Sequence, residues 1–156
     1  LCLPIAIAFP QTKVTLVDSL QKRVKFLEET VQKLGLQNVS IFHARAEEFA
    51  RIQRERKKYD IACSRAVARL NILAEYCIPF VKKGGYFIAY QSERLKEEMD
   101  EERKAVAILG GRVDQVISFQ LPGTDYNRTL VQIIKEKHTS GKYPRKAGTP
   151  GKDPLK

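Results

Sequence analysis

The sequence predicts an α/β fold whose sheet is mostly parallel and ends in an antiparallel hairpin. Short β-branched apolar segments alternate with segments of helical periodicity, and the links between them are short. Such alternation is typical of parallel strands joined by right-handed helical crossovers. The last two strand-like segments are separated only by residues 122–127, which is too short a link for a crossover, so these two strands are expected to pair antiparallel.

The first predicted strand covers residues 14–18 and leads into a helix over about residues 20–34. The strand is a β-branched apolar run that ends in Asp18. Ser19 is a candidate N-cap for the helix, and Gly35 is a stop signal at its other end. Apolar side chains recur at helical spacing along one side of the helical segment: Val24, Leu27, Val31 and Leu34.

The alternation continues along most of the remaining chain. The expected elements are, in order, a strand over 39–42, a polar helix over 46–56, a strand over 59–63, a helix over 70–81, a Lys-Lys-Gly-Gly turn over 82–85, a strand over 86–90, a charged helix over 93–109 and the hairpin strands 113–121 and 129–136. Gly110 and Gly111 are expected to end the charged helix, because glycine tolerates the left-handed conformation at a helix C-terminus.

Composition favours a single globular α/β domain with a polyanionic partner. A chain of 156 residues with 43% hydrophobic content is long enough to bury one core. The 28 Lys and Arg residues against 18 Asp and Glu give a net charge of +10, which suits nucleic acid. No apolar stretch approaches the roughly 20 residues of a membrane span. The three widely spaced cysteines are expected to be buried thiols, which indicates a reducing, cytoplasmic location.

The two ends of the chain differ from its body. The sequence opens at Leu1 without an initiator Met and enters an apolar run closed by Phe9 and Pro10, so an upstream part, including the first strand of the sheet, is expected to be missing. Residues 138–156 lose the apolar period and mix basic residues with Pro and Gly, which predicts a semi-extended tail without a core. The expected division is a truncated domain over 1–137 followed by a basic tail over 138–156.

Polar side chains follow the predicted strands at the edge where open α/β sheets bind ligands. Asp18 ends one strand, and a carboxylate there can accept hydrogen bonds from both hydroxyls of a ribose. The alternative is a helix N-terminal acid stabilised by the helix dipole. Ala46 and Glu47 follow the next strand, where they could reach an adenine, although Glu47 would equally serve as an ordinary helix-start acid.

Three arginines are candidate ligands of phosphate or of a guanine edge. Arg65 and Arg69 lie in the Ser-Arg-Ala-Val-Ala-Arg segment that joins a strand to a helix. Guanidinium groups at that edge suit phosphate and guanine, whereas the alternative is a pair of surface arginines. Arg128 opens the last strand and could reach the same edge or cap the hairpin.

The site needs a reaction that demands little from protein side chains. His43 and His138 lack partners at metal-ligand or nucleophile-activating spacing, so neither a metal site nor a Ser-His or Cys-His hydrolase is expected. Methyl transfer fits, because a sulfonium donor is already activated and the protein chiefly aligns donor and acceptor. Guanine N7 has an in-plane lone pair and no proton, so it needs no general base.

The sequence resembles the bacterial small-subunit ribosomal RNA guanine-N7 methyltransferases, also called glucose-inhibited division protein B, over essentially its whole length. The residues that carry the resemblance are Leu3-Pro4-Ile5 with Phe9-Pro10, Val17-Asp18-Ser19-Leu20 with Lys22-Arg23-Val24-Lys25-Phe26-Leu27, Arg45-Ala46-Glu47, Ser64-Arg65-Ala66-Val67-Ala68, and Lys142-Tyr143-Pro144-Arg145-Lys146-Ala147-Gly148-Thr149-Pro150. The resemblance implies a Rossmann-like S-adenosylmethionine methyltransferase fold. It also implies methylation of guanine N7 in 16S ribosomal RNA.

The resemblance also implies roles for individual residues. Ala46, Glu47 and Arg65 are expected to bind S-adenosylmethionine with Asp18 near its ribose, and Arg128 resembles the family's arginine near the active site. Arg69 and the tail are expected to guide the RNA, the tail through Lys142, Arg145 and Lys146. The implied partner is 16S ribosomal RNA or the small ribosomal subunit, bound by a monomer.

Two departures from the family pattern keep a second function open. The family's Gly-x-Gly turn upstream of the first predicted strand is absent, and Gln91 stands where many members have a lysine. The alternative function is a catalytically weak or inactive RNA-binding or ribosome assembly factor on the same fold. A dinucleotide oxidoreductase, which also places an acid after its second strand, is disfavoured by the antiparallel hairpin.

Overall fold

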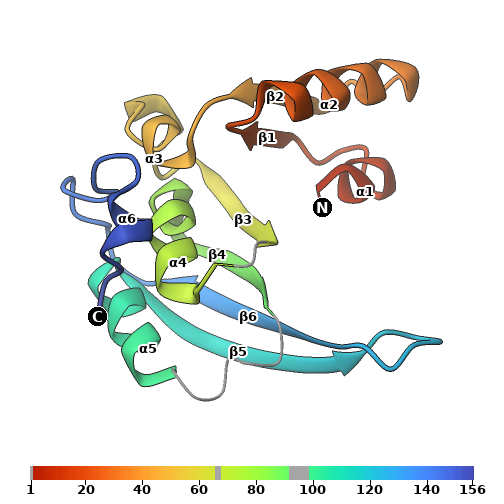
Figure 1. The fold of residues 1–156 in the computed structure, drawn as a ribbon. Coiled ribbons are helices and arrows are strands. Elements are labelled where there is room, and N and C mark those ends of the chain that lie inside the picture. The colour runs from red at the N-terminus through yellow and green to blue at the C-terminus, as the bar shows by residue number, and fades with distance from the viewer. Residues whose placement is uncertain (1, 66–67, 92–98) are drawn as a thin grey trace. The chain divides into compact units, whose positions relative to one another are not determined.

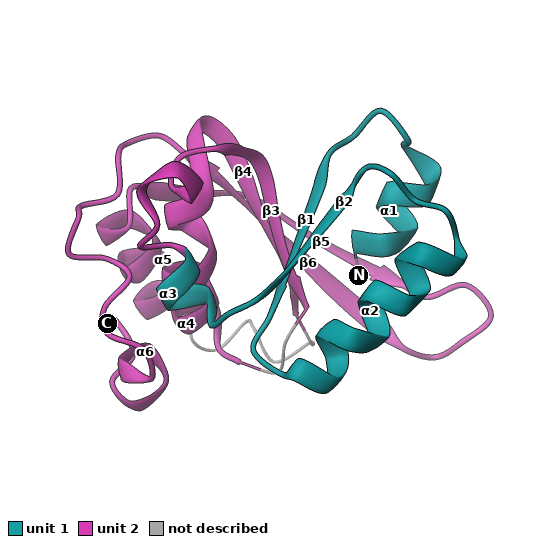
Figure 2. Cartoon of the chain, turned by 90° about the horizontal axis from the view of Figure 1, so that it is seen from above, with its two compact units in different colours: residues 1–49 teal, residues 50–156 magenta. Residues whose placement is uncertain are grey.

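The computed structural model describes residues 2–65, 68–91 and 99–156 (Figure 1). The chain forms two compact units, Leu1–Phe49 and Ala50–Lys156 (Figure 2). The boundary between the units lies at residues 49–50, and residues 138–156 belong to the second unit.

The first unit is a parallel β-α-β arrangement with a short helix at each end. Its elements are α1 (Cys2–Ala8), β1 (Val14–Asp18), α2 (Gln21–Lys33), β2 (Val39–His43) and α3 (Ala46–Phe49). The two strands pair in parallel from Val14 opposite Val39 to Asp18 opposite His43, as the sequence predicts. Gly35 adopts a φ of +63° and ends α2 as expected, while the Leu36 N–H donates to the Val31 carbonyl.

The start of α2 differs from the prediction. Ser19 is not the N-cap, because Leu20 holds that position without a side-chain cap bond. Instead the Asp18 carboxylate reaches two residues forward and accepts a hydrogen bond from the Leu20 N–H at 2.9 Å. Asp18 therefore belongs both to the end of β1 and to the start of the following helix.

The second unit is a four-stranded sheet covered by helices. Its elements are η1 (Gln53–Glu55), β3 (Tyr59–Arg65), α4 (Leu70–Cys77), η2 (Ile78–Phe80), β4 (Val81–Gln91), α5 (Met99–Ile108), β5 (Gly111–Gln120), β6 (Asn127–Lys135) and α6 (Thr149–Lys152). The strand order is β3-β4-β6-β5, with β3 and β4 parallel and both pairings of β6 antiparallel. This confirms the predicted hairpin. Residues 93–98 of the predicted charged helix lie outside the described residues.

The core of the second unit lies between one face of this sheet and the helices α4 and α5. Phe87 and Ala89 of β4 and Val131 and Ile133 of β6 point to the same face and are fully or almost fully buried. They belong to one cluster with apolar side chains of α4, of α5 and of the residue that follows α5: Leu70, Leu73, Ala74, Val106 and Leu109. Gly110, with a φ of +90°, ends α5 where the sequence predicts.

Two predicted elements are wrong in extent. The polar helix expected over 46–56 is broken into α3 and η1, since the backbone is extended at Ile52 and again at Arg56. Strand β4 begins at Val81 and includes the Lys-Lys-Gly-Gly segment that was expected to be a turn. The register against β3 skips from Val81 to Tyr86, and Gly84 supplies a φ of +84°, so this segment is a bulge within a strand.

The prediction that residues 138–156 form a tail without a core is wrong. Tyr143 joins the buried cluster and Leu155 packs against it. The Arg56 guanidinium holds the same segment by donating to backbone carbonyls at Tyr143 (2.6 Å), Thr139 and Ser140 (both 3.4 Å). An apolar period could not reveal this, because single side chains and backbone carbonyls anchor the segment.

Candidate functional site

Asp18 is the last residue of β1, and its carboxylate accepts two hydrogen bonds but keeps capacity to accept more. One oxygen accepts from the Leu20 N–H at 2.9 Å, and the other lies 3.2 Å from Nη1 of Arg23. An ionised carboxylate has about four lone-pair sites, so these two bonds leave room for further donors. Arg23, which sequence reasoning did not single out, lies in the first turn of α2, and its pairing with Asp18 fixes the orientation of the acid.

Ala46 and Glu47 lie at the same edge of the two-stranded sheet as Asp18. The Ala44 N–H donates to the Asp18 carbonyl at 3.1 Å, so the chain leaving β2 passes directly beside the end of β1. Glu47 is buried, and its Oε1 lies 3.4 Å from Nη2 of Arg45. The first unit therefore brings together the three predicted site residues that it contains.

Arg65 ends β3 at the carboxyl edge of the four-stranded sheet. It lies opposite Tyr90 of β4 and is exposed. The following residues of the predicted motif, 66–67, lie outside the described residues. Asp18 lies in the first unit and Arg65 in the second.

Arg69 lies at the N-cap position of α4, where the helix start is organised by an acid rather than by a hydroxyl. The Leu70 N–H donates to Oε1 of the buried Glu102 at 2.9 Å. Arg69 itself pairs with the exposed Glu101 at 3.6 Å. Exposed pairs of this kind contribute about 0–1 kcal/mol to stability.

Arg128 lies near the start of β6, at the same edge of the sheet as Arg65. Its guanidinium carbon is 5.5 Å from the centroid of the exposed Tyr126 ring, and Nη1 donates to the Asn127 carbonyl at 2.9 Å. Gln91 pairs with the neighbouring Thr129 and donates from Nε2 to the Ala68 carbonyl at 3.4 Å. The neutral amide of Gln91 thus links the end of β4 to the segment that precedes α4.

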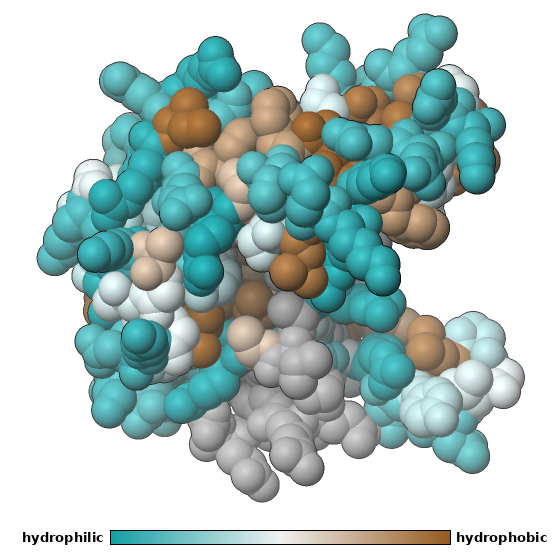
Figure 3. Space-filling model, turned by 45° about the horizontal axis from the view of Figure 1, so that its top comes forward, coloured by the Kyte–Doolittle hydropathy of each residue, from teal (hydrophilic) through white to brown (hydrophobic). Residues whose placement is uncertain are grey.

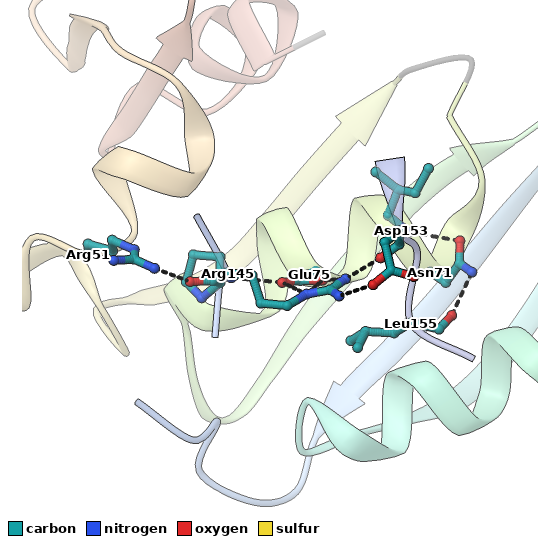
Figure 4. Close-up of polar contacts among 8 residues, drawn as sticks. Arg51, Asn71, Glu75, Arg145, Asp153 and Leu155 are labelled. Atoms are coloured by element: carbon teal, nitrogen blue, oxygen red, sulfur yellow. Dashed lines mark hydrogen bonds and ion pairs between the residues drawn. The ribbon is translucent and has the colours of Figure 1, made fainter. Parts of the chain in front are cut away.

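Arg145 of the C-terminal segment forms an ion pair with a buried acid (Figure 4). Its backbone N–H, Nε and Nη2 all donate to the fully buried Glu75 carboxylate, at 2.8, 3.0 and 2.8 Å to the nearest oxygen. Asp153 accepts from the remaining side of the fork at 3.3 Å. Hydrogen bonding to Glu75 raises the pKa of the Arg145 guanidinium above its usual value.

The neighbouring lysines of the tail differ from Arg145. Lys142 is exposed and its Nζ lies 5.2 Å from the centroid of the Tyr143 ring. Lys146 is also exposed. The tail also lies against a second basic segment, because Nη2 of Arg51 donates to the Pro144 carbonyl at 3.1 Å. Folding of the tail therefore places Lys142 and Lys146 near positive charges that lie some 90 residues earlier in the chain.

Other expectations concern metals, thiols and membranes. Within the described ranges, no three His, Cys, Asp or Glu side chains gather in a way that could hold a metal ion. Cys2, Cys63 and Cys77 are half-buried thiols rather than fully buried ones. No helix of the described part is long and apolar enough to cross a membrane.

Comparisons with known proteins point to one family. A family model described as GidB, rRNA small subunit methyltransferase G, matches residues 2–131. A protein named ribosomal RNA small subunit methyltransferase G from Exiguobacterium sibiricum is 48% identical over 98% of this chain, and its namesake from Alkaliphilus metalliredigens is 49% identical over 99%. The chain spans 64% of the length of each of these relatives.

Solved structures confirm the Rossmann-like methyltransferase fold. A 16S rRNA (adenine(1408)-N(1))-methyltransferase from Catenulisporales acidiphilia matches 88% of this chain with a TM-score of 0.70 at 12% identity, and the chain covers 79% of it. The same enzyme with its cosubstrate SAM matches with a TM-score of 0.68 at 15% identity. At this level of identity the likeness concerns the fold alone.

Proposed function

Because this chain belongs to the family of rRNA small subunit methyltransferase G, we propose that it methylates guanine N7 in 16S ribosomal RNA with S-adenosylmethionine as donor. The observation that carries the proposal is the family match over residues 2–131. It is supported by the position of Asp18, Ala46 and Glu47 at one edge of the β1-β2 sheet.

The residues at this edge suit an adenosyl group. The Asp18 carboxylate keeps acceptor capacity after its bonds to Leu20 and Arg23, and two vicinal ribose hydroxyls are donors that would use it. Glu47 and the backbone after β2 would hold the adenine. When bound, S-adenosylmethionine would supply a methyl group on sulfur whose S–C bond breaks as the lone pair of guanine N7 forms the new N–C bond, the released electron pair staying on sulfur.

The arginines would position the acceptor rather than move a proton. Guanine N7 carries no hydrogen, so nothing has to be removed before it attacks. Arg65 and Arg128 lie at the carboxyl edge of the four-stranded sheet with exposed guanidinium groups that can bind a phosphate or the guanine O6 edge. We assign both to alignment of the base, with Arg65 also near the donor.

Basic side chains would bind the RNA phosphates away from the target base. Arg69, Lys142 and Lys146 are the proposed contacts, while Arg145 organises the tail that carries the two lysines. Residues 1–137 would then supply the catalytic part, and the basic tail of residues 138–156 would add RNA contacts through Lys142 and Lys146. The proposed setting is a monomer in the cytoplasm acting on 16S ribosomal RNA or the small subunit.

The test is methyl transfer from a labelled donor to small-subunit RNA. The protein is incubated with S-adenosylmethionine carrying a labelled methyl group and with either naked 16S RNA or small subunits, and the digested RNA is searched for labelled 7-methylguanosine. Label in that nucleoside is expected. Donor binding without label would identify the weak or inactive RNA-binding relative, whereas label in another nucleoside would overturn the choice of N7.

Glu47 and Glu48 provide a matched pair for the donor site. They are adjacent acids in α3, but Glu47 is buried whereas Glu48 is exposed. Glu47→Gln should raise the Kd for S-adenosylmethionine by about 10-fold, as for loss of one charged hydrogen-bond partner, and Glu48→Gln should leave it unchanged. Equal effects of the two substitutions would contradict a donor site at this position.

A further inference from the structure

The end of the β5–β6 hairpin extends past the rest of its sheet. Pairing of β6 with β4 stops at Thr129, whereas pairing with β5 continues through Arg128 opposite Phe119 to Asn127 opposite Gln120. Figure 1 shows this end of the hairpin, with the loop 121–126, reaching beyond the end of β4. Apolar and weakly polar side chains gather at this projecting end (Figure 3).

The loop is held in place by its own hydrogen bonds. The Leu121 N–H donates to the Tyr126 carbonyl at 2.9 Å, and the Thr124 N–H donates to the Leu121 carbonyl at 3.1 Å. The Thr124 hydroxyl donates to the Leu121 carbonyl and accepts from the Tyr126 N–H at 3.2 Å. Both backbone polar groups of Tyr126 are therefore engaged, and the loop presents its ring in a defined place.

The ring so presented has the chemistry of a base-stacking surface. Tyr126 is 64% exposed, and the Arg128 guanidinium lies 5.5 Å from its centroid. The Arg128 hydrogen bond within the described chain uses one of five N–H donors and ends on a backbone carbonyl. Phe119, opposite Arg128 in the register, adds a second ring that is 37% exposed.

We propose that Tyr126 and Arg128 form a binding site for single-stranded RNA beside the target guanine. The Tyr126 ring stacks on a flanking base, and Arg128 binds an adjoining phosphate. Nucleic acid suits the site because aromatic rings interleaved with cations are the usual surface for unpaired bases and the whole chain carries a net charge of +10. The inference rests on the proposed function, since it names the RNA contact made next to the same sheet edge as Arg65.

The test measures binding of a guanine-containing single-stranded RNA oligonucleotide by fluorescence anisotropy at several KCl concentrations. Tyr126→Ala should weaken binding about 5- to 100-fold without changing the salt slope, because stacking releases no counterions. Tyr126→Phe should bind like the parent. Arg128→Gln should lower the salt slope by about 0.7, the value for one phosphate contact on a single strand. Phe26→Ala, which removes a 65% exposed ring from α2, serves as the matched control and should have no effect.

Failure of this site and failure of the proposed function give different results. Affinity for S-adenosylmethionine should be the same in Tyr126→Ala and parent protein, which verifies folding. Methylation of RNA together with unchanged RNA affinity in Tyr126→Ala would overturn the hairpin site alone. Tyr126-dependent RNA binding without 7-methylguanosine would instead overturn the proposed reaction and keep the site. A loss in Tyr126→Phe equal to that in Tyr126→Ala would also overturn stacking.

Discussion

Replacing Arg145 by alanine should destabilise the packing of the C-terminal segment against α4 within the second unit. Glu75 is fully buried on α4 and receives hydrogen bonds from Arg145 through Nε, Nη2 and the backbone N–H (Figure 4). Arg145→Ala removes the guanidinium and leaves a buried carboxylate with one backbone donor from this residue. Breaking a buried pair by removing one partner costs about 3–5 kcal/mol. Because the Arg145 side chain is 23% exposed, we expect the lower end, about 3 kcal/mol.

The assay is urea unfolding followed by circular dichroism, with hydrogen exchange of the α4 amides identifying the transition of the second unit. Lys152→Ala is the matched control, because it removes an exposed positive charge from the same segment and should change stability by less than about 0.5 kcal/mol. Adding Glu75→Gln to Arg145→Ala should recover part of the loss, since a neutral amide costs less to bury. Equal midpoints for Arg145→Ala and Lys152→Ala would refute the assigned role of the ion pair.

Three further predictions concern the backbone, pH and the donor site. Gly110→Ala should lower the free energy of unfolding in urea by at least about 2 kcal/mol, because the φ of Gly110 is +90° and a Cβ there would clash with the Lys137 carbonyl. Gly123→Ala is the control: its φ is +74° but the surrounding space is open, so it should cost about 1 kcal/mol. Equal losses in the two variants would exclude the clash. Burial and nearby positive charge lower the pKa of Lys135 to about 8. Between pH 8 and 10.5 the unfolded state therefore binds more protons than the folded state, and the free energy of unfolding should increase by up to about 3 kcal/mol as the pH is raised through this range. Lys135→Met should abolish this increase. Asp18→Asn should weaken S-adenosylmethionine binding by about 10-fold in calorimetry while the asparagine oxygen still accepts from the Leu20 N–H, and unchanged affinity would exclude the ribose role.

Much of the fold could be predicted because its signals are local. The strand at 14–18 and the helix after it follow from a β-branched run, a 3.6-residue apolar period and Gly35, which all lie within one short segment. The hairpin follows from the length of a single link. Asp18 could be chosen as a site residue for the same reason, since a carboxylate at a strand end is visible in the sequence itself.

What could not be predicted depends on partners that lie far apart in the chain. The helix expected over 46–56 stops early, and Arg56 instead bonds to the carbonyl of Tyr143, 87 residues later. The sequence around Glu75 indicates only an ordinary acid on a helix, and only the structure shows that Arg145 is its partner. Tyr126 lacks a sequence signal, because its exposure depends on how far the hairpin extends past β4.

The separation between Glu75 and Arg145 has a consequence for synthesis. The two residues are 70 positions apart, and a ribosome adds about 5–20 residues per second, so about 4–14 s pass between translation of the carboxylate and of its guanidinium. During that interval Glu75 on α4 lacks its partner, and burying its carboxylate would remove the water that solvates it. The nascent second unit should therefore stay open and exposed to chaperones until the basic segment emerges, whereas the β1-α2-β2 segment can close while translation is still under way.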